Sequence, residues 1–311
     1  MATLTFPRLP NDRRVAFPAR RRPPVGPGRR APGAAGAPVV ARIGSLEARL
    51  ARGQAELRAV QRLRYEVFYR EMAARPHAVA RLLRRDADDW DRVCDHLVVI
   101  DTSEAAAALP ATGGGRIVGT YRFLTAARAA TAGIGFYTQS EFDIATLVAR
   151  HRDLHFMELG RSCVLPAWRN RRTIELLWAA TWAYVLGHGV DVMIGCASFA
   201  GTDPDELAEP LAFLHHHAAP PPEWDVAAGP GRAVPTNRLD AGAVEARRAL
   251  HALPPLIKGY LRLGAWFGRE AVIDRQFATT DVLVILPVSR INPRYVSYYG
   301  ADASRHAVAA R

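Results

Sequence analysis

The chain has 311 residues, a net charge of +11, 49% hydrophobic residues and 23% charged residues. This length and composition predict a globular protein with a sizeable core, and they exclude a wholly disordered, collagen-like or disulfide-framework chain. No apolar run reaches the ~18 residues that a membrane-spanning helix needs; the nearest runs from Asp281 to Val288. We therefore expect a soluble or peripheral protein.

The positive charge is concentrated at the N-terminus. Residues 1–42 contain nine arginines and one acid, which account for eight of the eleven net charges. Their Pro-, Gly- and Ala-rich composition without apolar periodicity predicts a disordered basic tail. The tail is either bland, or an organellar leader, or an arm for anionic lipid. A polyanion-binding protein is an alternative function, but the near-neutral remainder argues against it, and we expect no nucleic-acid partner.

The three cysteines are odd in number and form no CxxC pair. This usage indicates a reduced, cytoplasmic compartment.

The predicted elements begin with a long amphipathic helix over residues 43–72, where apolar residues recur at helical spacing. Residues 94–101 and 116–124 then predict two antiparallel strands joined by a Gly-rich turn. A short helix is predicted to begin at Glu141.

The central part of the chain predicts one parallel β-α-β step. Residues 155–166 have the pattern of a long strand, residues 174–189 that of an apolar helix, and residues 190–199 that of a strand buried on both faces. The last third predicts a helix at 204–217, a surface loop at 218–236, a helix at 241–268 interrupted at Pro254 and Pro255, and strands at 271–274 and 280–288. Together these elements predict an α/β (α+β) fold with a mixed sheet that is antiparallel apart from this step.

Two histidine patterns were considered and set aside. His96 and Asp101 have the H-x4-D spacing of some acyltransferases, but five residues apart on a strand they point to opposite faces. The run His215 to His217 splays by about 100° per residue on a helix, so the three rings cannot bind one metal. We expect no metal site.

Glu158 and Arg161 lie three residues apart on the predicted strand 155–166. They face opposite sides of the sheet unless a bulge intervenes. A buried carboxylate needs a partner, so Glu158 is either half of a structural ion pair, with Arg122 or Arg64, or a general base whose pKa is tuned by burial.

A basic stretch follows this strand at the start of the next predicted helix. A helix N-terminus offers backbone N–H groups to a phosphate, and arginine adds bidentate contacts. The stretch consists of Arg169, Asn170, Arg171, Arg172 and Thr173.

These segments resemble a known family, the ornithine N-acyltransferases of bacterial ornithine-lipid synthesis. The resemblance runs from about Arg42 to Gly300 and is carried by residues 62–72, 91–101, 155–184, 191–204, 253–268 and 277–288. That family is similar in turn to the GNAT acyltransferases and the acyl-homoserine-lactone synthases, which share an E-x-x-R strand that Glu158 and Arg161 match. The resemblance implies a GNAT-like fold with a mostly antiparallel central sheet and helices on both faces, over residues 43–300, with a tail at 301–311.

The resemblance implies an N-acyltransferase that moves a 3-hydroxyacyl group from acyl carrier protein to the α-amine of L-ornithine, giving lyso-ornithine lipid. Another acceptor amino acid, a homoserine-lactone-type synthase and a coenzyme A acetyltransferase remain alternatives. Residues 169–174 lack both glycines with which GNAT proteins hold the coenzyme A pyrophosphate. We therefore expect a carrier-bound phosphopantetheine thioester as donor substrate and no tightly bound cofactor.

The resemblance also implies roles for single residues. Glu158 would be the base, directly or through water, while a backbone N–H near Cys163 or Val164 polarises the thioester carbonyl. The polar network around the base would consist of Arg64, Asp91, Arg122 and Arg161. No nucleophilic cysteine is required, and Cys163 and Cys196 are expected to be packing residues.

Two surfaces remain open at this point. The acidic carrier protein would meet Arg150, Arg152, Arg169, Arg171 and Arg172, unless these form only a solvated basic face. Residues 253–268 could lie at the inner-membrane interface, line an acyl channel, or belong to the core. A lipid product makes peripheral contact with the inner membrane an expectation for this otherwise cytoplasmic protein.

Overall fold

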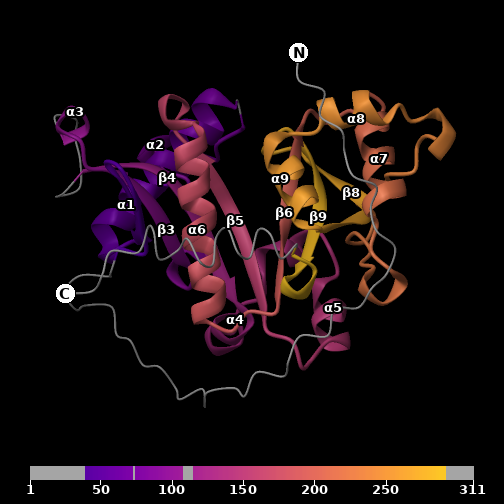
Figure 1. Ribbon diagram of the computed structural model, residues 1–311, viewed down its shortest axis with the longest axis horizontal. Coiled ribbons are helices and arrows are strands. Elements are labelled where there is room, and N and C mark those ends of the chain that lie inside the picture. Colours follow the sequence, from indigo (N-terminus) through magenta and orange to yellow (C-terminus); the bar gives the residue numbers. More distant parts are fainter. Residues whose placement is uncertain (1–38, 73, 108–114, 292–311) are drawn as a thin grey trace. The chain divides into compact units, whose positions relative to one another are not determined.

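The computed structural model describes residues 39–72, 74–107 and 115–291. In these residues nine strands form one sheet in the order β1-β2-β3-β4-β5-β6-β9-β8-β7 (Figure 1). Their bounds are β1 Ala41–Ile43, β2 Leu46–Leu50, β3 Asp95–Asp101, β4 Arg116–Thr125, β5 Phe156–Val164, β6 Val192–Ala200, β7 Ala233–Pro235, β8 Trp266–Asp274 and β9 Thr279–Pro287. Residues 1–38 and 301–311 of the predicted tails lie outside the described residues. Residues 41 and 42, which were predicted as part of the N-terminal tail, belong to β1.

The strand pairing confirms the predicted sheet. All neighbouring strands pair antiparallel except β5 and β6, which pair in parallel from Phe156 to Glu158. The crossover between those two strands contains helix α6 (Arg171–Gly187). The β-α-β step and the mixed, mostly antiparallel sheet are both as expected.

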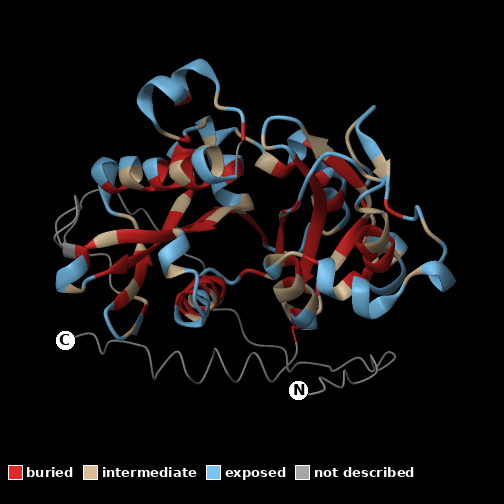
Figure 2. Cartoon of the chain, turned by 90° about the horizontal axis from the view of Figure 1, so that it is seen from above, coloured by how far each residue is buried: buried red, intermediate tan, exposed pale blue. Residues whose placement is uncertain are grey.

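Helices cover both faces of the sheet (Figure 1). On one face α6 packs over β1 to β4, and α7 (Ala208–Ala218), α8 (Ala246–Ala252) and α9 (Pro255–Leu263) pack in the same core over β6, β8 and β9. The other face carries α1 (Gly53–Tyr65), α4 (Ala126–Ala132) and α5 (Ile144–Arg150). The strands are buried between helices whose outward sides are exposed (Figure 2).

The predicted opening helix over residues 43–72 is wrong in its first part. Residues 41–50 form the hairpin of β1 and β2, which turns at Gly44 in the left-handed backbone region. The leucines of this segment fit a spacing of two as well as helical spacing, and pairing of β2 with β3 decides between them. The helix begins at Gly53 and continues beyond Tyr65 as a π-helical segment, Glu66–Glu71.

The second half of the chain needs three smaller corrections. The predicted helix end at 264–268 is a strand, because Gly264, with φ 93°, ends α9 and Trp266 begins β8. The predicted loop at 218–236 contains the edge strand β7. Helix α6 begins at Arg171 rather than at residue 174. The break between α8 and α9 at Pro254 is confirmed.

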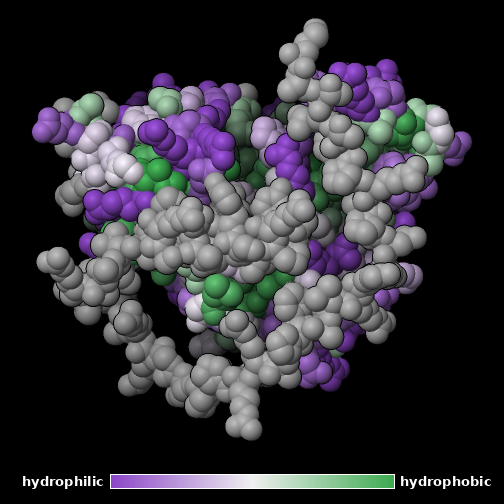
Figure 3. All heavy atoms as spheres, viewed as in Figure 1, coloured by the Kyte–Doolittle hydropathy of each residue, from purple (hydrophilic) through white to green (hydrophobic). Residues whose placement is uncertain are grey.

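The short helices α2 (Ala78–Leu83) and α3 (Glu104–Ala107) complete the described part. No helix in that part is long and apolar enough to cross a bilayer. Hydrophilic and hydrophobic side chains are interspersed on its visible surface in Figure 3.

Strands β5 and β6 diverge beyond their short parallel pairing, and this opens the sheet near its middle (Figure 1). Gly195 follows the last paired residue of β6. A Cβ atom there would lie 2.3 Å from the carbonyl oxygen of Leu159, so only glycine lets the two backbones approach at the point of divergence. The diverging strands create the space for the candidate site.

Candidate active site

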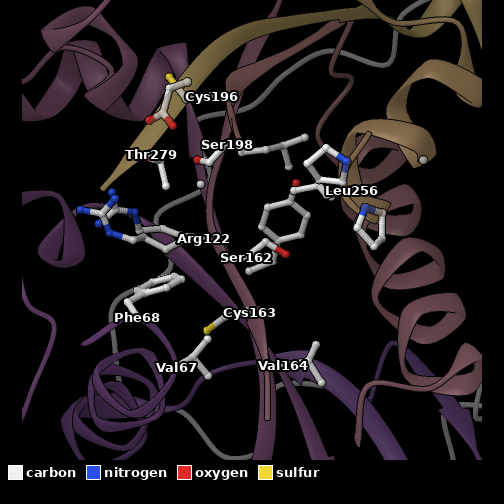
Figure 4. A pocket seen from close by; sticks show the side chains of 18 of the residues that line it. Val67, Phe68, Arg122, Ser162, Cys163, Val164, Cys196, Ser198, Leu256 and Thr279 are labelled. Carbon is white, nitrogen blue, oxygen red and sulfur yellow. The ribbon is translucent and has the colours of Figure 1, made fainter. Parts of the chain in front are cut away.

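A cavity of about 870 Å³ lies where β5 and β6 have separated, and residues from both faces of the sheet line it (Figure 4). One side of it is apolar. Leu177 and Trp178 of α6 line this side together with Leu256 and Leu263 of α9. Residues 253–268 were expected at the membrane interface, along an acyl channel or in the core. One side of α9 lines the cavity, and its other side, with Ile257 and Tyr260, belongs to the core. Such a wall suits an aliphatic chain.

The polar side of the cavity contains Glu158 on β5. This carboxylate is 4% exposed and forms no salt bridge in the described part of the chain, so of its two alternatives the ion pair with Arg122 or Arg64 is not formed, although the charge of Arg122 still opposes the rise that burial causes in its pKa. Instead, Oε2 accepts the amide of Tyr137 at 2.9 Å, and Oε1 accepts the amide and hydroxyl of Thr138 at 2.6 and 2.5 Å. A carboxylate offers about four acceptor positions, so one remains for an amine or a water.

Burial raises the pKa of Glu158, and the three hydrogen bonds from Tyr137 and Thr138 oppose that rise. A carboxylate in this environment is a stronger base than an exposed one. Its donors come from a single turn of 3₁₀ helix, Tyr137–Ser140, that the sequence did not predict.

A bulge brings Arg161 to the same side of the sheet as Glu158. The register between β4 and β5 shifts at this point, and Arg161 has a φ of 52°, which is uncommon for a residue with a side chain. Its guanidinium stacks on the rings of Tyr137 and Phe277, at 4.5 and 5.0 Å. Both members of the E-x-x-R pair therefore line the cavity.

Arg161 also belongs to a buried group of three arginines and three aspartates, here named the arginine–aspartate cluster. It consists of Arg64, Arg122, Arg161, Asp86, Asp88 and Asp91. Arg64, which is 0% exposed, bonds Asp91 with two nitrogens at 3.0 and 2.5 Å. Arg122 bonds Asp88 and Asp91, whereas the contacts of Arg161 with Asp86 and Asp88 are longer, at 3.4 Å.

The electrostatics of Asp91 reflect these partners. Burial disfavours its charge, but Arg64 and then Arg122 outweigh burial and hold the pKa of Asp91 well below its usual range. The four residues of the predicted polar network, Arg64, Asp91, Arg122 and Arg161, thus lie in one cluster, and Arg122 and Arg161 line the cavity together with the predicted base, Glu158. Asp86 and Asp88 were missed, although an acid-rich stretch before the first buried strand was a usable signal.

A second acidic group at the cavity has no arginine partner and was also missed. Its three carboxylates each have an oxygen within 4.8 Å of the others, and it is here named the acidic cluster: Glu141, Asp274 and Asp281. Burial, followed by the charge of Asp281, raises the pKa of Glu141 to about 7. Burial also raises the pKa of Asp281. Asp281 lies in the apolar predicted strand 280–288, where a single acidic residue indicates a functional position.

The predicted phosphate seat lies at the start of α6. Asn170 caps the helix by accepting the amide of Thr173, and carbonyls of the preceding turn accept the amides of Arg169 and Asn170. Three backbone donors are therefore already used. Arg169 donates to the carbonyl of Val164 and pairs with Glu71 of the π-helical segment. Arg171 pairs with Glu175, and Arg172 is exposed.

The five arginines that were expected to meet a carrier protein do not share one surface. Arg150 and Arg152 precede β5, whereas Arg169, Arg171 and Arg172 follow it, and nine strand residues extend over about 27 Å. Arg150 donates to the carbonyls of Glu223 and Asp225. Only the group at the start of α6 adjoins the cavity, through Arg169.

The motifs set aside in the sequence have separate structural partners. His96 contacts the Asp91 carbonyl, and Asp101 accepts the indole N–H of Trp168. His215 contacts Thr236, and His216 contacts the carbonyl of Leu239.

The cysteines Cys94, Cys163 and Cys196 are free thiols. Burial raises the pKa of Cys94 and Cys163 to about 12, which does not suit a nucleophile. Cys196 differs from a pure packing residue, because it lines the cavity and donates to Glu141 at 3.1 Å.

Comparison with known proteins agrees with this geometry. The model of the acetyltransferase (GNAT) domain matches residues 63–179. The fold and the cavity between the diverging strands define an acyltransferase of the GNAT type.

Curated relatives narrow the class to a family. An L-ornithine N(alpha)-acyltransferase from Agrobacterium fabrum is 53% identical over 264 residues, which cover 85% of this chain and 88% of that protein. The enzyme of the same name from Rhizobium meliloti is 50% identical over 277 residues, covering 89% and 92%. The chain belongs to the L-ornithine N(alpha)-acyltransferase family.

Two solved structures have a similar course of the chain. The N-acyl amino acid synthase FeeM from uncultured soil microbes has a TM-score of 0.42 at 12% identity, covering 78% of this chain and 91% of that one. The acyl-homoserine-lactone synthase LasI has a TM-score of 0.43 at 11% identity, covering 86% and 100%.

Proposed function

We propose that this acyltransferase moves a 3-hydroxyacyl group from the phosphopantetheine thioester of acyl carrier protein to the α-amine of L-ornithine, giving lyso-ornithine lipid. The observation that carries the proposal is the cavity between β5 and β6, which joins a buried carboxylate to an apolar channel. The curated relatives, which bear the name of this activity, support the acceptor.

Glu158 acts as the base in this reaction. An α-amino group with a pKa near 8 is mostly protonated at neutral pH, and only the neutral amine attacks a carbonyl. Glu158 takes the proton, directly or through a water, at its remaining acceptor position. The nitrogen then bonds to the thioester carbon and the C–S bond breaks. The leaving thiolate takes the second proton of the nitrogen, so the products are the amide and the carrier thiol.

The thioester carbonyl is polarised by a backbone N–H near Cys163 or Val164, which line the cavity beyond the bulge. The acyl chain extends along the wall formed by α6 and α9. Arg161 binds the acceptor's carboxylate, since its contacts with Asp86 and Asp88 are long and leave donors to spare.

A carrier-bound donor fits the start of α6 better than coenzyme A does. A pyrophosphate needs a loop of open amides, whereas those of Arg169, Asn170 and Thr173 are engaged internally. Phosphopantetheine brings one phosphate, and its carrier protein is acidic, which suits Arg169, Arg171 and Arg172. In this proposal the three arginines, with Asn170 and Thr173 at the start of α6, bind the phosphate of the donor and the acidic surface of its carrier.

The product is a single-chain lipid, so we place the protein in the cytoplasm in peripheral contact with the inner membrane. Helix α2 supports this placement. Val79, Leu82 and Leu83 of α2 are 58%, 81% and 46% exposed beside Arg81 and Arg84. Apolar side chains between arginines suit an anionic lipid surface.

The experiment that tests the proposal incubates purified protein with 3-hydroxyacyl carrier protein and each candidate amino acid. Thiol release is followed, and products are identified by mass spectrometry. We expect release that depends on ornithine and an N-acylornithine product. Glu158→Gln should lower kcat by about 10²- to 10⁴-fold with its unfolding transition intact.

Three outcomes would contradict parts of the proposal. Release with another amine alone would replace the acceptor. Turnover of acyl-coenzyme A without turnover of the carrier thioester would overturn the donor. Full activity of Glu158→Gln would remove Glu158 as the base.

A further inference from the structure

Asp281 carries a buried oxygen, Oδ1, that no hydrogen bond of the described residues satisfies, although the hydroxyls of Ser198 and Thr279 oppose the rise that burial causes in the pKa of this carboxyl. The residue is 6% exposed and lines the cavity, and its Oδ1 has no hydrogen-bond partner among the described residues. Its neighbours in the acidic cluster are held in place: Asp274 accepts the amides of Gln276 and Phe277, and Glu141 accepts the thiol of Cys196. Buried carboxylates in native structures normally have partners, so this one is arranged for a group that comes from outside.

The missing partner is a cation. No arginine, lysine or histidine forms a salt bridge with Glu141, Asp274 or Asp281 in the described part of the chain. The charges of Arg161 and Arg232 act on Asp281 and Glu141 from a distance, but Arg161 makes its salt bridges with Asp86 and Asp88, and Arg232 donates to the carbonyl of Ser140. Uncompensated negative charge in a buried place is costly, and an incoming positive charge relieves that cost.

The acidic cluster lies on the same face of the sheet as Glu158. Asp281 pairs with Ser198 of β6, and Glu158 pairs with Ile194 of the same strand, four residues earlier. Residues two and four apart on a strand share a face. Figure 4 shows Cys196, Ser198 and Thr279 together at this end of the cavity.

A short series of contacts spans the distance from the base to the cluster. Thr138 Oγ1 lies 2.5 Å from Glu158 Oε1 and 3.9 Å from Cys196 Sγ, which lies 3.1 Å from Glu141 Oε2. In extended ornithine the two nitrogens are separated by five bonds of about 1.5 Å each, hence by ~6 Å. An ornithine whose α-amine reaches Glu158 can therefore extend its second nitrogen along this series of contacts toward the acidic cluster.

We propose that Asp281, with Glu141 and Asp274, binds the side-chain ammonium of the acceptor amino acid and so selects a diamino acid. This inference rests on the proposed function and adds the group that reads the side chain. The bound zwitterion then lies between opposite charges, with its carboxylate toward Arg161 and its ammonium toward Asp281. An amino acid without the second amine leaves Asp281 buried and unpaired. Because an unpaired buried polar group costs free energy, the site binds such an analogue much more weakly.

The test compares L-ornithine with L-norvaline, which has the same carbon chain without the side-chain amine. With 3-hydroxyacyl carrier protein as donor, wild type should prefer ornithine by at least about 100-fold in kcat/KM. In Asp281→Asn this preference should fall by about 30-fold or more, because the ornithine value drops while the norvaline value does not. Asp205→Asn, at an exposed aspartate paired with Arg238, is the matched control and should keep the wild-type preference.

The outcomes separate this inference from the function on which it rests. N-acylornithine formation with an unchanged preference in a folded Asp281→Asn overturns the subsite alone. Absence of N-acylornithine from the wild-type reaction overturns the proposed function and the subsite with it.

A metal ion is the other cation that three carboxylates can hold. Mn²⁺ alone is therefore titrated into wild type and Asp281→Asn by calorimetry, and the transfer assay is repeated with EDTA. We expect EDTA to leave the preference for ornithine unchanged. Tight Mn²⁺ binding that Asp281→Asn abolishes, together with EDTA-sensitive transfer, would make the cluster a metal site and overturn the ammonium subsite.

Discussion

The two groups of carboxylates at the cavity lie on the same face of one sheet and differ in their partners. In the arginine–aspartate cluster three arginines match three aspartates, and the pKa of Asp91 is lowered. The acidic cluster contains no arginine, and the pKa values of Glu141 and Asp281 are raised. The charges of the first arrangement are paired within the described chain, whereas those of the second form no salt bridge there.

This difference separates a framework from a binding site. The paired cluster joins α1, the segment 86–91 and strands β4 and β5, so it fixes the walls of the cavity. The acidic cluster joins β8, β9 and the loop before α5, and no salt bridge of the described residues neutralises its carboxylates. Unsatisfied buried charge lowers stability and marks function.

The largest expected effect comes from breaking the paired cluster. Arg64→Met leaves Asp86 and Asp91 buried without their main cation, and the free energy of unfolding should fall by about 3–5 kcal/mol in urea titrations. Arg92→Met breaks the exposed pair with Asp89 close by and should cost less than about 1 kcal/mol. A similar small loss in both variants would contradict the distinction between the clusters.

The pH dependence of stability tests the unpaired cluster. Burial and the charge of Asp281 raise the pKa of Glu141 from its ordinary value of 4.5 to about 7. Between these pH values the folded chain holds a proton that the unfolded chain has lost, so stability falls as the pH rises from 4.5 to 7. Glu141→Gln should remove about 1–3 kcal/mol of this fall, measured by urea unfolding across that range. The exposed Glu206→Gln is the control, and equal slopes in both variants would exclude Glu141 as the source.

Substitution of one aspartate in each cluster should change stability in opposite directions. Asp281→Asn removes a buried charge without a salt bridge and should raise the free energy of unfolding at pH 7.5 by about 1–2 kcal/mol, which raises Tm by a few degrees. Asp91→Asn removes a charge that Arg64 and Arg122 need and should lower both quantities. Thermal unfolding of the two variants compares them directly, and a lower Tm for Asp281→Asn would mean that its charge has a partner.

The smallest effect on stability is expected at the exposed pair of Arg169 and Glu71. Arg169→Ala should change the free energy of unfolding by less than about 1 kcal/mol, because an exposed ion pair contributes little. If Arg169 meets the carrier protein, the KM for the acyl donor should rise several-fold, and more so at low salt. Arg150→Ala, at the opposite end of β5, should leave that KM unchanged. Equal effects of the two variants would remove the start of α6 as the docking site.

The sequence predicted the fold wherever a segment had one dominant periodicity. The continuous apolar runs of β6 and β9 and the hairpin of β3 and β4 could be read directly. It failed at residues 43–50, since the leucine spacing there suits a strand or a helix and the neighbouring strand β3 decides. It failed again at 264–268, where Gly264 ends a helix inside an unbroken apolar stretch.

The candidate site divides in the same way. Glu158, Arg161 and the residues of the predicted polar network could be found because a recognisable family motif carries them. Thr138 and Asp281 could not, because they lie far from β5 in the sequence and reach Glu158 or its surroundings only through sheet register and a loop. The bulge at Arg161 was foreseen as a condition, and only the register shift between β4 and β5 met it.

By itself the sequence determined the order of most elements and the parallel step, and it singled out Glu158 as the candidate base, because these depend on local spacing and on residue identity. The tertiary structure decided which charges are neutralised. Arg64 forms a salt bridge with Asp91 across 27 residues, whereas no arginine of the described chain forms one with Asp281. Charge pairing depends on distance and burial, which the linear order of residues does not contain.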